Sequence, residues 1–288
     1  LAWLRSLGLG PGQSARIHAA LGDATEEKIN EDPYQLARIV EGIGFATADR
    51  IALGMGFSRD DPRRLAAGLL HTLRRSADSG HTFLAEPALL DESSSVLGLE
   101  DCAAALRGEL AALRASEAVI IEGENEEGRR VYLPHLAASE RGLARQLTEL
   151  LSASSLGALA TPDQLAAAEA ASGLDLHTDQ RSAVLGLLAE PVGLLTGGPG
   201  VGKTTIIRLV VDLAMAAGAK IALASPTGRA AKRLAEATGH DASTIHRLLG
   251  WDPHKRGFQH DHDSPLEVDL VVIDEISMLD VVLAYHLT

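Results

Sequence analysis

The chain has 288 residues, of which 46% are hydrophobic and 3% aromatic, so we expect a core packed mainly from Ala, Leu and Val rather than a disordered chain. Its 26 Lys and Arg against 39 Asp and Glu give a net charge of −13, which excludes binding of nucleic acid by a broadly basic surface. The single Cys102 excludes an internal disulfide and suits the cytoplasm, and the sequence has neither a signal-peptide pattern nor an uncharged stretch of membrane-spanning length.

Residues 1–60 contain a short internal repeat, in which 8–17 and 42–51 share a Gly-x-Gly turn followed by an Arg-Ile pair, with an offset of 34 residues. Each copy is typical of two helices joined by a tight glycine turn, which leaves amides at a helix start free to bind a phosphate. The pattern resembles the helix-hairpin-helix module, which holds the DNA backbone without reading its sequence. It predicts DNA contacts at Gly42 and Gly44 of the better-matching second copy. The alternative is a pair of helical hairpins that only pack on each other.

Residues 61–152 predict a helical connector that ends in a β-hairpin. Apolar residues recur at helical spacing in 65–70 and 99–113, and the pattern changes to short strands within 119–133. The acidic stretch 123–128 predicts the tip of that hairpin. Helices followed by a hairpin favour a winged-helix-like connector with a scaffold role.

From residue 161 onward the pattern predicts an α/β domain. Thr161 and Pro162 predict the start of a helix, and Gly173 its end. We then expect helices near 178–189, 203–216 and 228–238, and strands near 192–196, 220–224 and 268–273. Strands that alternate with helices predict a parallel sheet with right-handed crossovers.

The most specific motif is the stretch 197–204, Gly-Gly-Pro-Gly-Val-Gly-Lys-Thr, between an expected strand and an expected helix. A glycine-rich turn at a helix start lets backbone amides surround a phosphate. Lys203 would reach the β- and γ-phosphates of ATP, and the Thr204 hydroxyl would help to hold Mg²⁺. A chance glycine-rich turn is the alternative, which the flanking strand and helix disfavour. The residues expected to bind the nucleotide in this segment are Gly198, Gly200, Val201, Gly202, Lys203, Thr204 and Thr205.

An apolar strand pattern over 270–273 ends in Asp274 and Glu275, about 70 residues after the phosphate loop. Parallel strands present ligand sites at their carboxyl ends, so both side chains should lie near that loop. Asp274 would hold Mg²⁺ through water, and Glu275 would orient and deprotonate the attacking water. With Lys203, they are the expected catalytic residues of a phosphoryl transfer to water.

Three further segments have residue types suited to binding. Gln180, at the start of a helix, could pair with an adenine edge through its amide, or could be an ordinary solvated residue. The segments 225–234 and 243–249 each combine hydroxyl residues at a helix start with basic residues, which suits a phosphate backbone. The alternative for each is a capped helix with a solvated basic face.

The ordered set of Gln180, 197–205, 225–234, 243–249 and 274–278 resembles the RecD-like helicases of superfamily 1, in the stand-alone bacterial form with helix-hairpin-helix repeats. The resemblance implies a RecA-like P-loop ATPase domain over 161–288, with ATP and Mg²⁺ as cofactors. It also implies 5′→3′ translocation on single-stranded DNA, unwinding at DNA junctions, and single-strand-binding or repair proteins as partners. The DNA contacts that it implies are Ser225, Thr227, Arg229, Thr244 and His246.

The chain starts at Leu1 rather than Met, and it stops at Thr288, before the family's later motifs and its arginine fingers. We therefore expect a fragment truncated at both ends, which binds nucleotide and Mg²⁺, hydrolyses ATP slowly and does not unwind DNA. Two other classes stay open: a P-loop ATPase or kinase independent of DNA, and a non-catalytic DNA-binding module. Stimulation of hydrolysis by single-stranded DNA would separate the first from a helicase, and the intact Lys203 and Asp274 disfavour the second.

Overall fold

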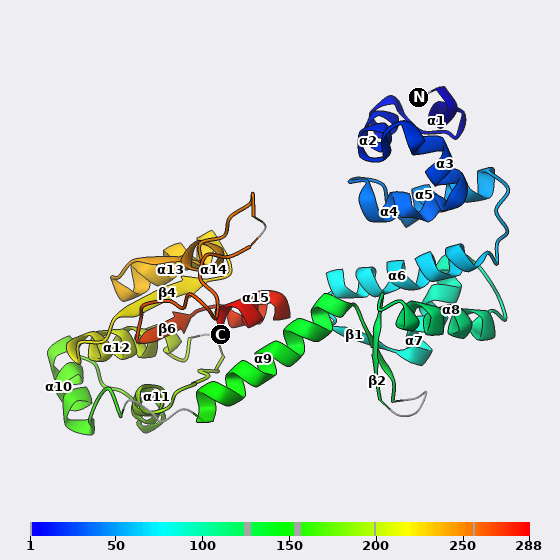
Figure 1. The fold of residues 1–288 in the computed structure, drawn as a ribbon. Helices are drawn as coiled ribbons and strands as arrows, with labels where there is room; N and C mark the ends of the chain where they lie inside the picture. Colours follow the sequence, from blue (N-terminus) through cyan, green and yellow to red (C-terminus); the bar gives the residue numbers. More distant parts are fainter. Residues whose placement is uncertain (1, 124–127, 153–156, 199, 256) are drawn as a thin grey trace. The chain divides into compact units, whose positions relative to one another are not determined.

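The computed structural model of the chain describes residues 2–123, 128–152, 157–198, 200–255 and 257–288. It divides into two compact units, Leu1–Ala138 and Ser139–Thr288, which we describe one at a time (Figure 1). The predicted division into 1–60, 61–152 and 161–288 stays a prediction. Among the described helices, none has both the length and the apolar character needed to cross a membrane.

The first unit begins with short helices joined by tight turns. Their bounds are α1 Ala2–Ser6, α2 Pro11–Leu21, α3 Thr25–Glu31, α4 Leu36–Ile39 and α5 Phe45–Gly54, with 3₁₀ turns η1 Gly22–Ala24 and η2 Pro33–Gln35. The predicted repeat is present in this backbone, because Gly8 and Gly42 have φ angles of +79° and +77°, which favour glycine. Gly10 and Gly44 then form the N-caps of α2 and α5. The equivalent Ile17 and Ile51, 0% and 1% exposed, both pack into the core, so each copy is the predicted helical hairpin.

A buried ion pair attaches the second hairpin to α6, Pro62–Asp78. The Arg64 guanidinium donates to both carboxylate oxygens of Asp49, at 2.7 and 3.0 Å, and Arg64 is 4% exposed. It also donates to two backbone carbonyls, and the Tyr34 hydroxyl donates to Asp49 at 2.8 Å. Burial, together with the hydrogen bond to Asp49, raises the pKa of Tyr34 above its usual value. Since each buried group has partners, this network holds the hairpin in place without an uncompensated charge.

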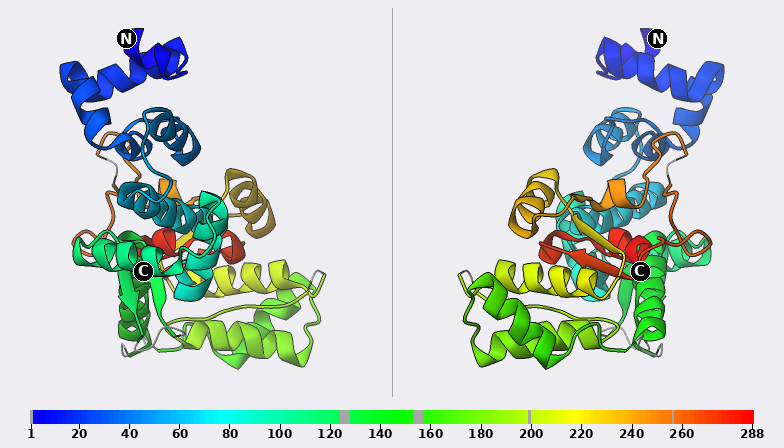
Figure 2. Two further views of the ribbon diagram at one scale, coloured as in Figure 1. Left: turned by 90° about the vertical axis from the view of Figure 1, so that its right-hand side faces the viewer. Right: turned by 90° about the vertical axis from the view of Figure 1, so that its left-hand side faces the viewer.

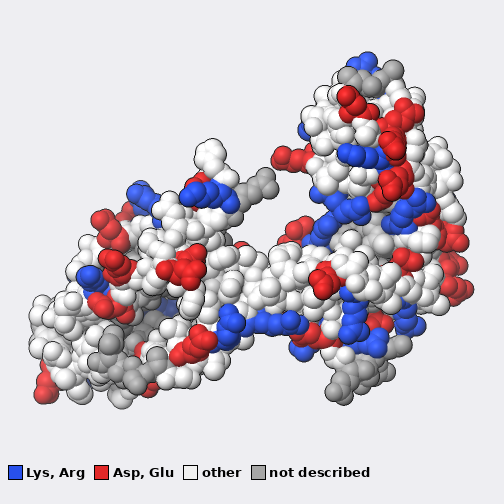
Figure 3. Space-filling model, viewed as in Figure 1, with Lys and Arg blue, Asp and Glu red and all other residues white. Residues whose placement is uncertain are grey.

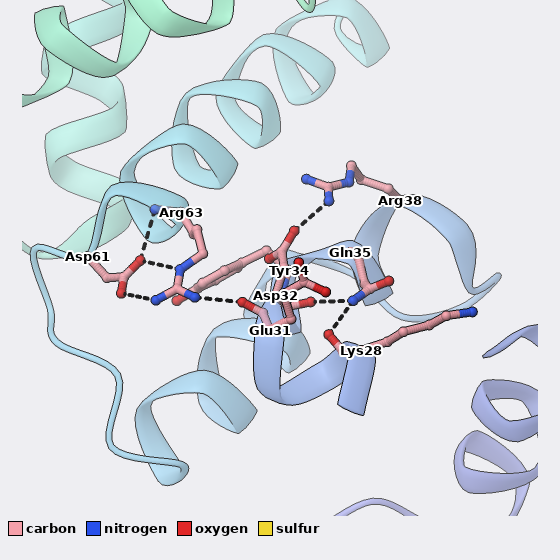
Figure 4. Close-up of polar contacts among 8 residues, drawn as sticks. All are labelled: Lys28, Glu31, Asp32, Tyr34, Gln35, Arg38, Asp61 and Arg63. Carbon is pink, nitrogen blue, oxygen red and sulfur yellow. Dashed lines mark hydrogen bonds and ion pairs between the residues drawn. The ribbon is translucent and has the colours of Figure 1, made fainter. Parts of the chain in front are cut away.

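Polar contacts at the start of α6 form a second connection to the hairpins (Figure 4). Arg63 donates to the Asp61 carboxylate at 2.7 Å and to the Glu31 carbonyl, at the end of α3, at 2.6 Å. Asp32 accepts from the Tyr34 amide at 2.9 Å and so caps η2. These bonds join α3, η2 and α6, so hydrogen bonds connect the hairpins to the start of α6.

The rest of the first unit is a helical group with a small sheet. After α6 come β1 Phe83–Ala85, α7 Glu86–Leu97, α8 Ala103–Ala115, β2 Ile120–Glu122 and β3 Arg130–Tyr132. The strands are antiparallel in the order β1-β3-β2, so the predicted hairpin is confirmed and a third strand joins it. Residues 124–127 of the predicted acidic tip lie outside the described residues. This order of helix, strand, two helices and hairpin agrees with the predicted winged-helix-like connector, which stays a prediction. Helix α9, Pro134–Ser152, continues from this unit into the second.

The second unit is a parallel α/β domain. Its elements are α10 Pro162–Ser172, α11 Thr178–Ala189, α12 Lys203–Ala216, β4 Ile221–Ser225, α13 Gly228–Thr238, β5 Ala242–Thr244, α14 Ile245–Leu248, β6 Leu270–Ile273, η3 Ile276–Met278 and α15 Val281–Leu287. Strand β4 lies between β5 and β6 and is parallel to both. The predicted α/β class is confirmed, and the three predicted helices coincide with α11, α12 and α13. The Thr161 cap of α10 and the left-handed Gly173 at its end are also as predicted.

Helices cover both faces of the parallel sheet (Figure 2). On one face, Leu223 of β4 packs with Val211 of α12 and Leu234 of α13. On the other face, the next residue, Ala224, packs with Ile245 of α14. Successive residues of a strand point to opposite faces, so β4 is buried on both sides, as the central strand of a parallel sheet should be.

The predicted strand at 192–196 is wrong for this structure. Residues 193–198 have no regular secondary structure, and the sheet formed by the described residues has the order β5-β4-β6. A strand needs a ladder of backbone hydrogen bonds and cover for its side chains. Leu194 is 69% exposed and Val192 is 37% exposed, and only Leu195 packs against the core of α11 and α12. The apolar run therefore lacks the cover that the sequence pattern assumed.

Candidate nucleotide and DNA site

The acidic pair and the two predicted DNA segments of the second unit lie at the carboxyl ends of three neighbouring strands. Strand β4 ends at Ser225, opposite Thr244 of β5, and Ala224 lies opposite Ile273 of β6. The Asp274 amide donates to the Ala224 carbonyl at 3.0 Å, which fixes the acidic pair at the same edge. This edge is where open parallel sheets bind ligands. The topology thus brings together segments that are about 50 residues apart in the sequence.

The phosphate loop leads directly into α12. Gly200 and Gly202 have φ angles of +79° and +86°, and Gly202 is the N-cap of the helix that starts at Lys203. A Cβ on Gly202 would lie 2.7 Å from the Gln180 amide nitrogen, and one on Gly197 would lie 2.8 Å from Val201. The positive φ angle therefore favours glycine at Gly202, and a Cβ there would also require the Gln180 side chain to move. Pro199 lies outside the described residues.

Lys203 folds its side chain back over the loop. Its ammonium donates to the carbonyls of Gly197 and Gly198, at 2.7 and 2.8 Å. These carbonyls are neutral acceptors, so an anionic phosphate would compete with them for the same ammonium. Thr204 is exposed and Thr205 half-buried at the start of α12, where amides not used by the helix favour an anion.

Gln180 contacts the phosphate loop, so it is not simply a solvated residue. Its amide nitrogen donates to the Val201 carbonyl at 3.0 Å, and its amide oxygen accepts from the His177 amide at 2.8 Å. The second bond is part of a capping box at the start of α11. Gln180 thus connects α11 to the loop, and its expected contact with adenine stays a prediction.

The acidic pair lies where β6 ends. Asp274 is half-buried, and Glu275 is exposed with φ of +58°, a left-handed conformation that costs a non-glycine residue about 1 kcal/mol or more. Backbone strain of this kind is typical of functional sites. This conformation lies between β6 and η3, at the carboxyl end of the strand.

The two predicted DNA segments lie side by side. A Cβ on Gly228, at the start of α13, would lie 4.0 Å from the Thr244 methyl group. The hydroxyls of Thr227 and Thr244 cap α13 and α14 by accepting from Ala230 and Arg247, each at 3.3 Å. Both helix starts therefore open at one place, with exposed Arg229 and His246 beside them.

Ser225 differs from the other predicted DNA contacts. It is 0% exposed, and its hydroxyl has no hydrogen-bond partner among the described residues. A fully covered side chain presents nothing to a DNA strand in this conformation. Its assignment as a DNA contact stays a prediction that the structure does not favour.

In the first unit, the two hairpins differ at their helix starts. The Gly10 amide donates to the Gln13 side chain at 3.2 Å, and Pro11 has no amide hydrogen to offer. In the second copy, the amides of Gly44 and Phe45 have no hydrogen-bond partner within the described part of the chain. Within the described residues, the start of α5 therefore has free amides at its N-cap and first helical positions, whereas the start of α2 has none at these two positions.

Sequence reasoning missed the surroundings of this helix start. A hollow of about 560 Å³ lies beside α5, and its lining includes Arg50, His71 and Arg75. The His71 ring stacks on Phe45, with the ring centres 5.1 Å apart. Burial and the neighbouring arginines lower the pKa of His71. These residues come from α5 and α6, and only packing brings them together.

Figure 3 shows basic and acidic residues interspersed on the viewed face.

The residues of the phosphate loop and the acidic pair have the chemistry that a nucleotide with its metal ion needs. The loop supplies the ammonium of Lys203 and the amides at the start of α12 for a triphosphate. No three His, Cys, Asp or Glu side chains gather into a metal site within the described ranges. Thr204 and Asp274 would therefore hold Mg²⁺ together with phosphate oxygens and water, which is the usual way that proteins bind it.

Comparison with known proteins gives two family matches. Residues 1–83 match the helix-hairpin-helix domain of ATP-dependent RecD2 DNA helicases, and residues 180–288 match the AAA domain. Together they include both predicted hairpins and the whole sheet edge. Residues 180–288 are therefore similar to an AAA domain, and residues 1–83 to the helix-hairpin-helix domain of RecD2 helicases.

Individual relatives agree with these matches. The chain is 37% identical over 288 residues to the ATP-dependent RecD2 DNA helicase of Deinococcus radiodurans. The aligned region covers 97% of this chain and 39% of the relative. It is 34% identical over 184 residues to the RecBCD enzyme subunit RecD of Mycolicibacterium smegmatis. That aligned region covers 56% of this chain and 32% of the relative. The chain thus spans less than half the length of these relatives. The predicted similarity to RecD-like helicases is confirmed.

Proposed function

We propose that this chain, which belongs with the RecD-like helicases, supplies the nucleotide-binding part of an ATP-driven motor that moves 5′→3′ along single-stranded DNA. One observation carries the proposal. The phosphate loop precedes α12, and the acidic pair and the two predicted DNA segments all follow strands that end at one edge of one sheet. A motor needs its catalytic carboxylates close to the groups that hold DNA, because a change at the phosphates must move those groups.

In the proposed ATP site, Lys203 exchanges its two carbonyl partners for the β- and γ-phosphates, and the amides at the start of α12 surround them. When bound, Mg²⁺ neutralises phosphate charge. Thr204 and Asp274 are the residues that would hold it. Glu275, exposed at the end of β6, accepts the proton of the attacking water. Gln180 holds the loop through Val201 and faces the base.

In the proposed DNA track, the starts of α13 and α14 bind neighbouring phosphates of the strand. Thr227 and Thr244 position these helix starts, and Arg229 and His246 are accessible beside them. In the first unit, the free amides at Gly44 bind the backbone of duplex or junction DNA. Binding without base recognition suits a motor that must act on any sequence.

The lone Cys102 supports a cytoplasmic location.

The decisive measurement uses the complete protein. ATP hydrolysis is measured with and without single-stranded DNA, and unwinding is measured on duplexes with either a 5′ or a 3′ tail. We expect DNA to stimulate hydrolysis and only the 5′-tailed duplex to be unwound. An equal rate of hydrolysis with and without DNA would leave an ATPase unrelated to DNA, and unwinding from the 3′ tail would reverse the proposed polarity.

The water-activating residue has its own test. Glu275→Gln keeps the shape of the side chain and removes the base, so hydrolysis should fall by about 100-fold or more while ATP stays bound. Glu267→Gln, an exposed carboxylate elsewhere in the same unit, is the matched control and should change neither property. Hydrolysis at the wild-type rate in Glu275→Gln would show that another group takes the proton.

A further inference from the structure

The second unit has an aromatic cluster directly after α14. The chain has only two Trp, three Tyr and four Phe, yet Trp251, Phe258 and Tyr285 lie together with two histidines. The ring centres of Trp251 and Phe258 are 4.9 Å apart, and those of Phe258 and His286 are 4.8 Å apart. His246 lies 6.1 Å from Trp251 by the same measure. Such a concentration in an aromatic-poor chain calls for a reason beyond ordinary packing.

A buried core and backbone hydrogen bonds support the cluster. Phe258 packs against a buried core that includes Ile245 and Leu249. The Trp251 amide donates to the His246 carbonyl at 2.9 Å, and Asp252 and Gly257 form a β-bridge that brings Phe258 back under the tryptophan. The position of the Trp251 ring is therefore determined by the fold. Despite this support, Trp251 remains 41% exposed.

The charge around the cluster suits a nucleic acid. Arg247 and Lys255 are exposed on either side of Trp251 in the sequence, and neither forms an ion pair in the described part of the chain. The Asp252 carboxylate is already engaged, because it accepts from the amides of His254 and Lys255. Asp252 keeps its negative charge, but Arg247 and Lys255 offer two cations, unpaired among the described residues, close to Trp251 in the sequence, in a chain whose net charge is −13.

We infer that Trp251, flanked by His246, is a stacking platform for a base of the single strand. The ring follows the Thr244 helix start by seven residues, so a strand whose phosphates bind at α13 and α14 has bases within reach of it. Stacking on an aromatic ring tolerates any base and contributes about 1–3 kcal/mol per base. A protein partner, in contrast to a nucleic acid, would bury the apolar surface of the cluster without needing the cations of Arg247 and Lys255. This inference rests on the proposed DNA track and adds the group that holds the base.

The number of tryptophans makes the test direct. In a Trp3→Phe background, Trp251 is the only tryptophan and reports its own environment. Two equally long probes are titrated: oligo-dT, and a sugar–phosphate strand without bases. We expect oligo-dT to quench the fluorescence and the base-free strand to bind without quenching. Absence of quenching by bound oligo-dT would overturn the inference.

Variants measure the contribution to affinity. By anisotropy of a labelled probe, Trp251→Ala should weaken binding of oligo-dT by about 5-fold or more and binding of the base-free strand by less than about 2-fold. Trp251→Phe, which keeps a ring, should restore most of the affinity, and Met215→Ala, an apolar residue 47% exposed on α12, is the control. Equal loss for both probes would overturn the inference. Binding of an ATP analogue, measured separately, tests the nucleotide site, so quenching without nucleotide binding would contradict the motor and leave the platform standing.

Discussion

The ion pair at α6 in the first unit and the predicted site residues of the second unit use their polar side chains in different ways. In the first unit, Arg64 and Asp49 are covered, and their hydrogen bonds are made to each other, to Tyr34 and to the backbone. In the second unit, the partners of the Lys203 ammonium among the described residues are two carbonyls, and Arg229 and His246 are exposed. Covered charges hold a structure together, because breaking one pair leaves the other charge buried. Accessible groups whose present partners are neutral can exchange those partners for a charged ligand. The contrast separates residues that maintain the fold from residues that act.

Removing the buried carboxylate should have the largest effect on stability. Asp49→Ala leaves the Arg64 guanidinium buried without its partner, and we expect the free energy of unfolding of the first unit to fall by about 3–5 kcal/mol. Denaturant titration measures this. Asp91→Ala, an exposed carboxylate on α7, should change stability by less than about 0.5 kcal/mol. A small effect in Asp49→Ala would mean that the ion pair is not what attaches the hairpin to α6.

Removing the loop ammonium should weaken ligand binding and leave stability almost unchanged. Lys203→Ala should weaken binding of a non-hydrolysable ATP analogue by about 10-fold or more, since a charged hydrogen bond contributes about 1.5–3 kcal/mol. Stability of the second unit should change little, because only two carbonyl contacts are lost. Calorimetric titration and thermal melting measure the two effects, with the exposed Lys232→Ala as control. Unchanged nucleotide affinity would contradict the phosphate assignment of this loop.

A substitution at the hairpin turns tests whether the two copies differ in function. Gly44 has extended backbone angles and open space where a Cβ would stand, so Asp fits there. Gly44→Asp should cap α5, stabilising it by about 0.5–1 kcal/mol, and should weaken DNA binding through repulsion of the phosphate. Gly10→Asp is the matched change in the first copy and should leave DNA binding nearly unchanged. Equal losses in both variants would assign DNA contact to both hairpins.

The smallest expected effect is the pH dependence of His71. Burial and the nearby arginines hold its folded pKa below the usual value, so the unfolded chain binds the proton more readily. Stability should therefore be full above the usual histidine pKa of about 6.5 and decrease as the pH falls toward the lower folded pKa. His71→Gln should remove this part of the pH dependence, measured as the difference between the two melting profiles at pH 5 to 7. Parallel profiles would show that His71 contributes nothing.

Much of the fold followed from local patterns. The bounds of α11, α12 and α13 coincide with the predicted helices, because each has a clear start signal and an apolar face. The repeated Gly-x-Gly turns predicted both hairpins for a similarly local reason. The strand at 192–196 failed because an apolar run indicates burial, while a strand also requires a partner.

By itself, the sequence determined the kinds of chemistry present: a phosphate loop, an acidic pair after a strand, and glycine turns before helices. These depend on residues within a few positions of one another, so local sequence suffices to specify them. Tertiary structure alone decided which residues meet. It placed Gln180 against Val201, covered Ser225, attached Arg64 to Asp49 and built the cluster around Trp251. Such contacts join residues that are distant in the chain, and their partners are selected by packing, which no short pattern encodes.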